Sequence, residues 1–466
     1  MFGKRLFPGG IHPHEGKNGK AVNGLNPIVE LPAPKRVVIP MAQHGGAPAK
    51  VAVKKGERVL MGQLIGEAGG FVSAPVHASV SGTVADIVDQ LMFNGSECQA
   101  VVIENDFQDE WKLLDLPWQS GKPTADELRQ VIRDAGIVGM GGATFPTPVK
   151  LSIGAGKVFE KLIINGAECE PYLTADHRLM LEHADGIIDA VEIVKEAFKV
   201  PEAIIGVEEN KPDAIQALRE AVGAREGIRV QALPVRYPQG GEKQLIYALT
   251  KRVVPAGGLP IDAGCVVLNA GTCFAIHEAV RERKPLVHRV TTVGGLVQKP
   301  GNYLVRIGTP VRNLIKASGG TLPETRTIIS GGPRMGTAFQ DIDIPVTKGC
   351  SGILALGREA IDPEESPCIR CGRCMRACPM QLQPQLMDHY IRAEKFDEAD
   401  RVGVLSCIEC GACTFVCPAK RLLTQSFRAG KRIVNIRRRQ QKAREDAEKA
   451  ALAARNAEQQ QNGKEA

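Results

Sequence analysis

Eight cysteines near the C-terminus repeat one spacing twice, and this repeat is the strongest chemical signal in the sequence. In each run, three thiolates separated by two residues on a tight loop can each reach a different iron of one cubic cluster. The pattern C-x₂-C-x₂-C-x₃-C-P therefore predicts two [4Fe–4S] clusters, which exchange electrons one at a time. The runs comprise Cys368, Cys371, Cys374 and Cys378 before Pro379, and Cys407, Cys410, Cys413 and Cys417 before Pro418.

The fourth cysteine of each run is predicted to bind the cluster of the other run, as it does in two-cluster bacterial ferredoxins. Gly372 and Gly411 relieve crowding where the loops wrap the clusters. Zinc is the main alternative metal, but a Cys₄ zinc site gives no reason for a second full set of ligands. Disulfides fit poorly, because the sequence shows no secretory signal. The predicted ligand sets are Cys368, Cys371, Cys374 and Cys417 for one cluster, and Cys407, Cys410, Cys413 and Cys378 for the other.

The composition is that of a globular protein with several domains. The chain has 466 residues, more than the roughly 250–300 that one hydrophobic core usually supports. Its 50 glycines and 30 prolines predict many turns. The sequence contains no run of about 18 apolar residues and no apolar N-terminal signal segment, so we expect a protein in or facing the cytosol. The net charge of +7 owes much to a basic cluster between residues 431 and 444.

Residues 1–115 are predicted to form a β-sandwich. Residues 36–104 alternate apolar and polar side chains between glycine turns, which is typical of short strands. Their order resembles the biotinyl/lipoyl barrel-sandwich, whose carrier proteins present a lysine in a hairpin. His77-Ala78-Ser79 occupies that hairpin here, so the resemblance implies a packing or docking role rather than a swinging arm. His44 and His77 are interpreted as residues beside turns rather than as metal ligands.

Residues 116–285 alternate strand and helix patterns. A helix is predicted to begin after Thr124, because Thr124 and Glu127 have the spacing of a capping box. Alternation of strands and helices predicts a parallel sheet covered by helices. The predicted strands are 162–165, 203–207 and 266–269, and the predicted helices are 177–199 and 212–223.

The last third of the sequence is predicted to hold three further parts. Residues 286–345 return to a β pattern, and their V-G-G-x-V-x-x-P-G-x-Y motif resembles the SLBB β-grasp module. Residues 346–427 carry the cysteine runs, bridged by a helical segment at 382–402. Residues 428–466 are basic and then rich in Ala, Glu and Gln, which predicts a solvated helix that frays. The predicted fold is thus multidomain, combining α/β and α+β parts.

A second group of residues has the types needed to bind a phosphate. Residues 139–150 form a glycine-rich loop that ends at Lys150. Such loops let backbone N–H groups approach an anion, and the lysine adds a positive charge. A tight turn explains the glycines equally well, and the loop is neither the Walker A motif nor the dinucleotide fingerprint. The nearby segment 165–171 follows a buried strand, where the ligand sites of open α/β sheets lie.

These segments, with Gly240-Gly241-Glu242 and Asn269-Ala270-Gly271-Thr272, resemble the flavin- and NADH-binding subunit of respiratory complex I (NuoF). The resemblance implies FMN and NAD(H) as cofactors. At two positions where that family has acidic residues, this sequence has Ala167 and Lys243. These departures weaken the resemblance for the NADH half of the site more than for the FMN half. The implied roles are phosphate binding by Gly139, Gly141, Gly142 and Lys150, contacts to flavin or nicotinamide by Asn165, Glu170 and Asn269, and a nucleotide side lined by Phe145 and Glu242, with Glu170, Phe145 and Glu242 as the catalytic candidates.

The order of all segments resembles the RnfC/RsxC subunit of the Rnf/Rsx electron-transport complex. The motifs that carry this resemblance are F-P-G-G-I-H-P at 7–13, N-G-A-E-C-E-P-Y-L-T-A-D at 165–176 and Y-P-Q-G-G-E-K-Q-L at 237–245. The family implies a peripheral protein on the cytoplasmic face of the bacterial inner membrane, bound to membrane-embedded partners of the A, B, D, E and G types. It also implies electron transfer between NADH, by way of FMN, and the two clusters, with ferredoxin as a further electron source, coupled to ion translocation.

Two other functions are compatible with the sequence. A soluble cobalamin reductase of the propanediol-utilisation type has the same order of flavin, SLBB and twin-cluster segments. A non-enzymatic electron wire would follow if Ala167 and Lys243 mark a vestigial flavin pocket. The basic tail favours the membrane-associated complex, because its charge fits anionic lipid or an acidic partner. Nucleic-acid binding is disfavoured, because the tail lacks aromatic side chains that could stack on bases.

Charged side chains flank the two cysteine runs differently. Arg370, Arg373 and Arg376 lie within the first run, where they would either raise the potential of its cluster or form a solvated docking face. Glu409 in the second run would act on the potential in the opposite direction. Four cysteines outside the runs are interpreted as structural, namely Cys169, Cys265, Cys273 and Cys350.

Overall fold

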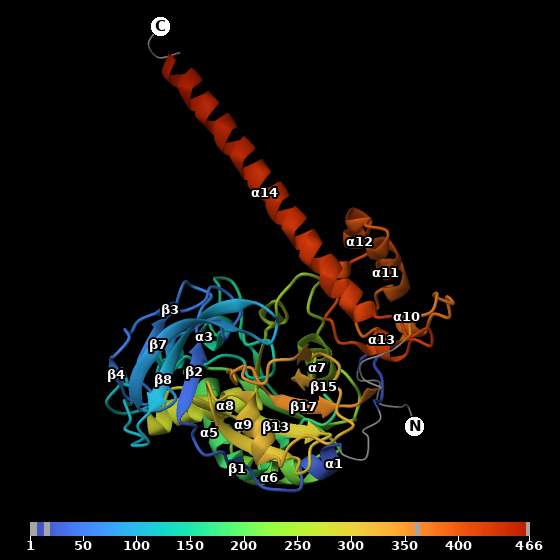
Figure 1. Ribbon diagram of the computed structural model, residues 1–466. Helices are drawn as coiled ribbons and strands as arrows, with labels where there is room; N and C mark the ends of the chain where they lie inside the picture. Colours follow the sequence, from blue (N-terminus) through green and yellow to red (C-terminus); the bar gives the residue numbers. More distant parts are fainter. Residues whose placement is uncertain (1–6, 14–18, 359–363, 463–466) are drawn as a thin grey trace. The chain divides into compact units, whose positions relative to one another are not determined.

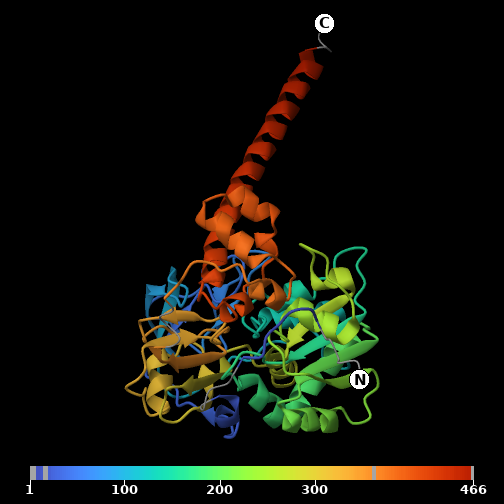
Figure 2. The same cartoon turned by 90° about the vertical axis from the view of Figure 1, so that its right-hand side faces the viewer.

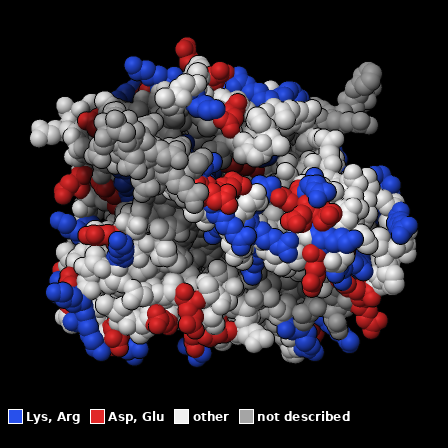
Figure 3. Space-filling view, turned by 90° about the horizontal axis from the view of Figure 1, so that it is seen from above, with Lys and Arg blue, Asp and Glu red and all other residues white. Residues whose placement is uncertain are grey.

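The computed structural model describes residues 7–13, 19–358 and 364–462, with side chains to residue 450. The chain divides into two compact units (Figure 1). Unit 1 comprises Met1–Phe7 and Ile11–Pro363, and unit 2 comprises Pro8–Gly10 and Glu364–Ala466. On the visible part of the face in Figure 3, basic and acidic side chains are interspersed, so the net charge of +7 is not gathered into one patch there.

The N-terminal part of unit 1 consists of two small antiparallel sheets, as the alternating pattern predicts. Their inward side chains, among them Val37, Ile65 and Val101, are fully buried. His77 ends a strand and is itself buried, so it occupies a packing position rather than the tip of a carrier hairpin. The sheets are β2 (Arg36–Pro40), β8 (Glu97–Asn105), β7 (Gly82–Leu91) and β4 (Arg58–Val59), and β3 (Lys50–Val51), β5 (Leu64–Glu67) and β6 (Val76–His77).

A four-stranded parallel sheet follows, which confirms the predicted α/β arrangement. Its strands bury both faces: Leu162 and Ile164 pack with one group of helices, and Ile163 packs with Leu245 and Ile246 on the other side. Burial on two faces explains why these strands are continuous apolar runs. The sheet order is β11 (Ile228–Leu233), β10 (Glu202–Glu208), β9 (Lys161–Gly166) and β12 (Cys265–Asn269).

The helices around this sheet largely follow the predictions. Helix α2 begins with the predicted capping box, in which Glu127 N donates to Thr124 Oγ1 at 3.3 Å. The single helix predicted at 177–199 is instead two helices, because the backbone leaves the helical region at His183, with φ −129° and ψ 34°. The helices are α2 (Ala125–Asp134), α3 (Thr147–Lys150), α4 (Ala175–Glu182), α5 (Ala184–Ala197), α6 (Pro212–Val222), α7 (Glu242–Thr250) and α8 (Ala270–His277).

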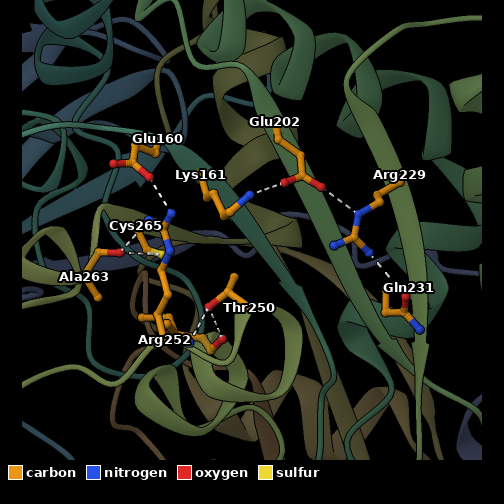
Figure 4. A network of polar contacts seen from close by, with 10 residues as sticks. Glu160, Lys161, Glu202, Arg229, Gln231, Thr250, Arg252, Ala263 and Cys265 are labelled. Atoms are coloured by element: carbon orange, nitrogen blue, oxygen red, sulfur yellow. Dashed lines mark hydrogen bonds and ion pairs between the residues drawn. The ribbon is translucent and has the colours of Figure 1, made fainter.

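An ion-pair network joins the amino ends of the parallel strands (Figure 4). Glu202 at the start of β10 lies between Lys161 of β9 and Arg229 of β11, and its carboxylate accepts from both. Lys161 and Arg229 lower the pKa of Glu202. The pairs tie three neighbouring strands together at the edge opposite the carboxyl ends, where ligand sites of such sheets lie.

Replacing Glu202 with glutamine is therefore expected to weaken local stability without affecting cofactor binding. The two ion pairs are partly exposed, so we expect a loss of about 1 kcal/mol at pH 7. A lowered folded-state pKa gives stability that is present above the unfolded pKa and is lost as the pH falls below about 4. Hydrogen exchange of β10 and β11 amides in the parent and the variant, compared at pH 7 and below about pH 4, measures this effect. Glu104→Gln, which breaks one exposed pair with Arg36, is the control and should leave β10 unchanged.

The remainder of unit 1 is a six-stranded mixed sheet, and helix α9 (Val311–Ala317) packs against it. The strands predicted near 290, 301 and 327 are present. The sheet continues past residue 345, because β17 lies between β13 and β15, so a module limit at 345 omits an inner strand. Its order is β1 (Val29–Glu30), β14 (Gly301–Arg306), β13 (His288–Gly295), β17 (Gly352–Leu356), β15 (Thr327–Ser330) and β16 (Thr337–Phe339).

Unit 2 is helical and packs around Met387, Phe396 and Phe427. The predicted tail helix is present as α14, the long helix in Figures 1 and 2, and it begins at Leu423, before the predicted limit of 428. From residue 435 to 450 its side chains are exposed. Within the described residues, no helix combines the length and apolar character needed to span a membrane. The other helices are α10 (Arg373–Ala377), α11 (Pro384–Arg392), α12 (Phe396–Arg401) and α13 (Ala412–Phe415).

Candidate functional site

The two cysteine runs share one backbone geometry. Arg370 and Glu409, each one residue before the second cysteine of its run, adopt left-handed conformations with φ 55° and 57°. Gly372 and Gly411 follow with φ 72° and 75°. A short helix then starts in each run, α10 in the first and α13 in the second. The repeated spacing in the sequence is therefore a repeated loop in the structure.

Cysteines of the second run line a small cavity of about 20 Å³ within unit 2. Cys378, the last cysteine of the first run, lies on the same cavity, so the structure brings together the four residues that were predicted to share a cluster. Backbone N–H groups of Leu382 and Glu409 donate to the sulfurs of Cys378 and Cys407, each at 3.3 Å. Such bonds tune cluster potentials. The four cysteines on the cavity are Cys378, Cys407, Cys410 and Cys413.

Burial changes the acidity of these thiols. It raises the pKa of Cys407 to about 11 and that of Cys410 to about 12. Without a metal these groups therefore hold their protons at neutral pH, and iron binding must release them. The four thiols, with apolar side chains such as Met387 and Phe427 around them, are the residue types that a [4Fe–4S] cluster requires.

The first run is more open to solvent. Cys368 and Cys371 are exposed, whereas Cys374 is partly buried and donates its S–H to Gln385 Oε1 at 3.5 Å. The pKa of Cys374 is raised, chiefly by burial and also by the neighbouring Cys417. The last cysteine of the second run thus lies near Cys374 of the first run.

The charges beside the two runs have different surroundings. Glu409 pairs with Lys431 at 2.6 Å and with Arg428 at 3.2 Å, both from α14. These cations offset the negative charge that was predicted to lower the potential of the second cluster. Arg370 and Arg376 in the first run are exposed, and no ion pair holds either of them within the part of the chain that the structure describes.

The glycine-rich loop in unit 1 is closed by its own backbone. Gly139 N donates to Phe145 O at 2.8 Å, and Met140 N donates to Thr272 Oγ1 at 2.9 Å. Gly142 has φ +117°, a conformation that favours glycine, and a Cβ there would meet no atom within 4 Å. Gly141 packs against Asn269, whose Cβ lies 3.4 Å from where a Gly141 Cβ would be. The loop thus presents open backbone at Gly142 and contacts another predicted site residue at Gly141.

Lys150, at the end of this loop, meets the predicted residue Glu242. Its Nζ donates to Glu242 Oε1 at 2.9 Å and to Val267 O at 3.3 Å. The pair is only partly buried, so both charges remain accessible to solvent. A phosphate that bound Lys150 would therefore compete with the carboxylate of Glu242.

The polar segment after β9 contacts the loop before α7. Asn165 Nδ2 donates to Gly240 O at 2.9 Å, and Gly240 N donates to Cys169 Sγ at 3.3 Å. The side chain of Gln239 is buried, and neither its amide nitrogen nor its amide oxygen has a partner among the described residues. Orphaned amide atoms beside Asn165 and Gly240 fit a bound polar ring that completes their hydrogen bonds.

Asn269 and Glu170 are both held in place by neighbours that the motifs did not single out. Asn269 caps α8 by accepting from Gly271 N at 2.9 Å, and its Nδ2 donates to Asp176 Oδ2 at 2.6 Å. Burial raises the pKa of Asp176 to about 7. Glu170 accepts from Tyr237 O–H at 2.9 Å.

Glu170 also accepts from Arg334 N at 3.0 Å, and burial raises its pKa. Phe145 lies near Gly45 of the barrel-sandwich part. The structure thus links Lys150 with Glu242 and Gly141 with Asn269, but it gives Glu170 and Phe145 other partners. Asp176 and Tyr237 lie within two of the sequence motifs, and only their bonds to Asn269 and Glu170 identify them.

Comparison with known families covers most of the chain. Matches are found to the RnfC barrel sandwich hybrid domain at residues 5–108, the Nuo51 FMN-binding domain at 132–278, the SLBB domain at 290–338 and the 4Fe-4S dicluster domain at 360–418. A subunit of the proton-translocating ferredoxin:NAD(+) oxidoreductase complex of Clostridium ljungdahlii is 48% identical over 91% of this chain and 93% of its own. The chain belongs to the RnfC family.

A second RnfC relative, from the Na(+)-translocating ferredoxin:NAD(+) oxidoreductase complex of Acetobacterium woodii, is 44% identical over 93% of this chain and 98% of its own. A chain of the NAD+-reducing [NiFe]-hydrogenase in the air-oxidized state shares 18% identity, with a TM-score of 0.47 over 66% of this chain and 64% of that one, values too low to bear on function. The predicted resemblance to RnfC and the predicted order of fold types are confirmed. The RnfC chain carries an FMN-binding domain and a dicluster domain.

Proposed function

We propose that this protein passes electrons between NAD(H) and two [4Fe–4S] clusters by way of FMN, as the RnfC subunit of an ion-translocating ferredoxin:NAD(+) oxidoreductase complex. The observation that carries the proposal is the presence of an FMN-binding domain and a dicluster domain in one chain. Relatives that match nearly end to end are named as subunits of ion-translocating ferredoxin:NAD(+) oxidoreductase complexes. FMN supplies the step between two-electron and one-electron chemistry.

The chain's own residues would bind and orient these groups. Lys150 and the backbone N–H groups of the glycine loop would hold the FMN phosphate, with Glu242 released from Lys150. Asn165 and Asn269 would face the flavin ring, with the carboxylate of Glu170 on the nicotinamide side. The neighbouring bonds from Asp176 and Tyr237 support this assignment, because they fix the side chains of Asn269 and Glu170. The cluster ligands would be the eight cysteines in the exchanged sets given above.

The partners and location follow from the same family. The protein would associate with the membrane-embedded subunits of its complex as a peripheral protein on the cytoplasmic face of the membrane. The exposed basic part of α14 supports contact with anionic lipid or an acidic partner. Trimming residues 430–466 and testing flotation with liposomes would separate lipid binding from binding to a partner.

Anaerobic purification followed by NADH titration tests the proposal. The full-length protein should be yellow-brown, contain flavin and iron, and lose its flavin absorbance when NADH is added. A colourless protein, or one that holds zinc in place of iron, would contradict it. A yellow protein that NADH does not bleach would instead indicate an electron wire with a vestigial NADH site.

Cys374→Ala is expected to separate the two halves of electron transfer. The variant should lose electron transfer to the membrane partners while NADH still reduces its flavin, because the FMN-binding domain lies in a different unit from this cysteine. Stopped-flow absorbance of the flavin measures its reduction by NADH, and reduction of the membrane partners measures the onward transfer. Circular dichroism is the folding control, because the loss of a cluster ligand itself lowers the iron content. Loss of flavin reduction in a folded variant would count against the proposed order of cofactors.

A further inference from the structure

We propose that the surface of the first cysteine run is a docking face for an acidic protein that carries one electron at a time. This first-run face comprises Ile369, Arg370, Arg373, Met375 and Arg376. The inference deepens the proposed function and rests on it, since it assigns the exposed cluster as the place where electrons enter or leave unit 2.

The second cysteine run provides an internal comparison for the arginines of the first. The two runs share their cysteine spacing and the left-handed residues that shape the loop. Where the first run has Arg370, Arg373 and Arg376, the second has a glutamate, an alanine and a phenylalanine, namely Glu409, Ala412 and Phe415. Because the second loop has the same backbone without these arginines, binding a cluster does not require them. Their charge must serve something other than the loop.

The first-run face is also the more exposed of the two. All three arginines are exposed, and none takes part in an ion pair within the described ranges 7–13, 19–358 and 364–450. At the matched positions, Ala412 is buried and Glu409 is neutralised by Lys431 and Arg428. Unpaired charge beside an exposed cluster is free to attract a partner.

Apolar side chains complete the face. Ile369 is 66% exposed and Met375 is 41% exposed, next to the arginines and the exposed Cys368 and Cys371. Exposed apolar atoms within a charged rim are typical of a protein interface. Between Ser366 and Cys378 the three arginines are the charged residues, so the face is uniformly positive along this stretch. Charge complementarity therefore selects an acidic partner over a basic one.

The redox step across this face balances with one electron. The reduced carrier gives up one electron, the first cluster takes it, and no bond forms or breaks. In the opposite direction the same electron reduces the carrier. Short-lived complexes of this kind are steered by charge, and their association weakens as salt screens it.

The test compares two triple variants with equal loss of charge in full-length, anaerobically prepared protein. R370Q/R373Q/R376Q removes the charge of the first-run face. K50Q/K299Q/K316Q removes three exposed lysines of unit 1 and serves as the matched control. The probe is an acidic two-cluster ferredoxin, immobilised with both proteins oxidised, so that the dissociation constant is measured without electron transfer. Binding is measured at about 0.02 M and about 0.3 M NaCl, where the Debye length differs several-fold.

We expect the arginine variant to bind at least about tenfold more weakly than the parent at low salt, and to lose most of its salt dependence. The lysine variant should change less than about twofold. In the arginine variant, photoreduced ferredoxin should reduce the first cluster more slowly, whereas the methyl viologen radical cation should reduce it at the parent rate. Equal binding by all three proteins, equal weakening in both variants, or equal slowing with both reductants would overturn the proposal.

Two further controls separate this inference from the proposed function. NADH should bleach the flavin equally in both variants, and failure in the parent protein would defeat the proposed function while leaving the binding result to stand. If the triple variant loses iron, the single variant R376Q on α10 is tested instead, and we expect it to bind ferredoxin about threefold more weakly than the parent. Unchanged binding by R376Q in that case would overturn the docking face.

Discussion

Replacing Cys378 and Cys371 together with serine is expected to remove nearly all cluster iron, whereas replacing Cys378 and Cys410 together should leave about half. The difference follows from the exchanged ligand sets, in which Cys378 and Cys410 serve the same cluster and Cys371 serves the other. Cys378 lies on the cavity that Cys410 lines, although it belongs to the first run in sequence. Iron and acid-labile sulfide per chain, measured after anaerobic reconstitution, give the answer directly.

The reverse outcome would show that each run binds its own cluster. In that case the Cys378 and Cys371 variant would keep about half of the iron, and the Cys378 and Cys410 variant would lose it. Cys98→Ser, which changes a cysteine of β8 outside both runs, is the control and should keep all of the iron. The circular dichroism of the helical unit 2 checks that each variant remains folded.

Lys150→Ala is expected to weaken FMN binding by about 10- to 100-fold. A charged hydrogen bond to a phosphate is worth about 1.5–3 kcal/mol, and its loss gives a change of this size. Glu242→Gln should instead strengthen FMN binding, because the carboxylate of Glu242 pairs with Lys150 at 2.9 Å and competes with the phosphate. Fluorescence titration of the deflavinated protein with FMN measures both affinities.

Lys157 provides a matched control for this prediction. It lies seven residues beyond Lys150 and pairs with Asp262 at 2.7 Å rather than with a predicted site residue. Lys157→Ala should bind FMN as the parent protein does. FMN binding at full strength by Lys150→Ala would exclude this lysine as the phosphate ligand and would leave the phosphate to the backbone of the glycine loop.

The fold was predictable where the sequence pattern is local. The buried strands of the parallel sheet are continuous apolar runs, and the capping box at Thr124 needs only residues three apart. Strand β11 was not predicted, because it is an edge strand in which Arg229 and Gln231 interrupt the apolar residues. Strand β17 lies beyond the recognisable SLBB motif, and its pairing of Gly352 with Thr292 joins residues that no local pattern connects.

The site was predictable in its residue types but not in its contacts. The glycine loop, Lys150 and Glu242 could be named from motifs, yet their ion pair joins residues 92 positions apart. In the same way, the sequence places Glu409 beside a cluster but cannot show that Lys431 of a distant helix offsets its charge. Charge at a site is a sum over neighbours in space, and the sequence lists neighbours along the chain only.

The meeting of Cys378 with the second run has a consequence for how the protein matures. On the exchanged assignment, neither run can be removed on its own, since excising one would leave one iron cube with a single ligand and the other with three. A nascent chain that has emerged only as far as Pro379 holds no complete set of thiols. Both sets become complete almost together, at Cys413 and Cys417, so the assembly machinery that delivers iron and sulfide meets an all-or-none substrate.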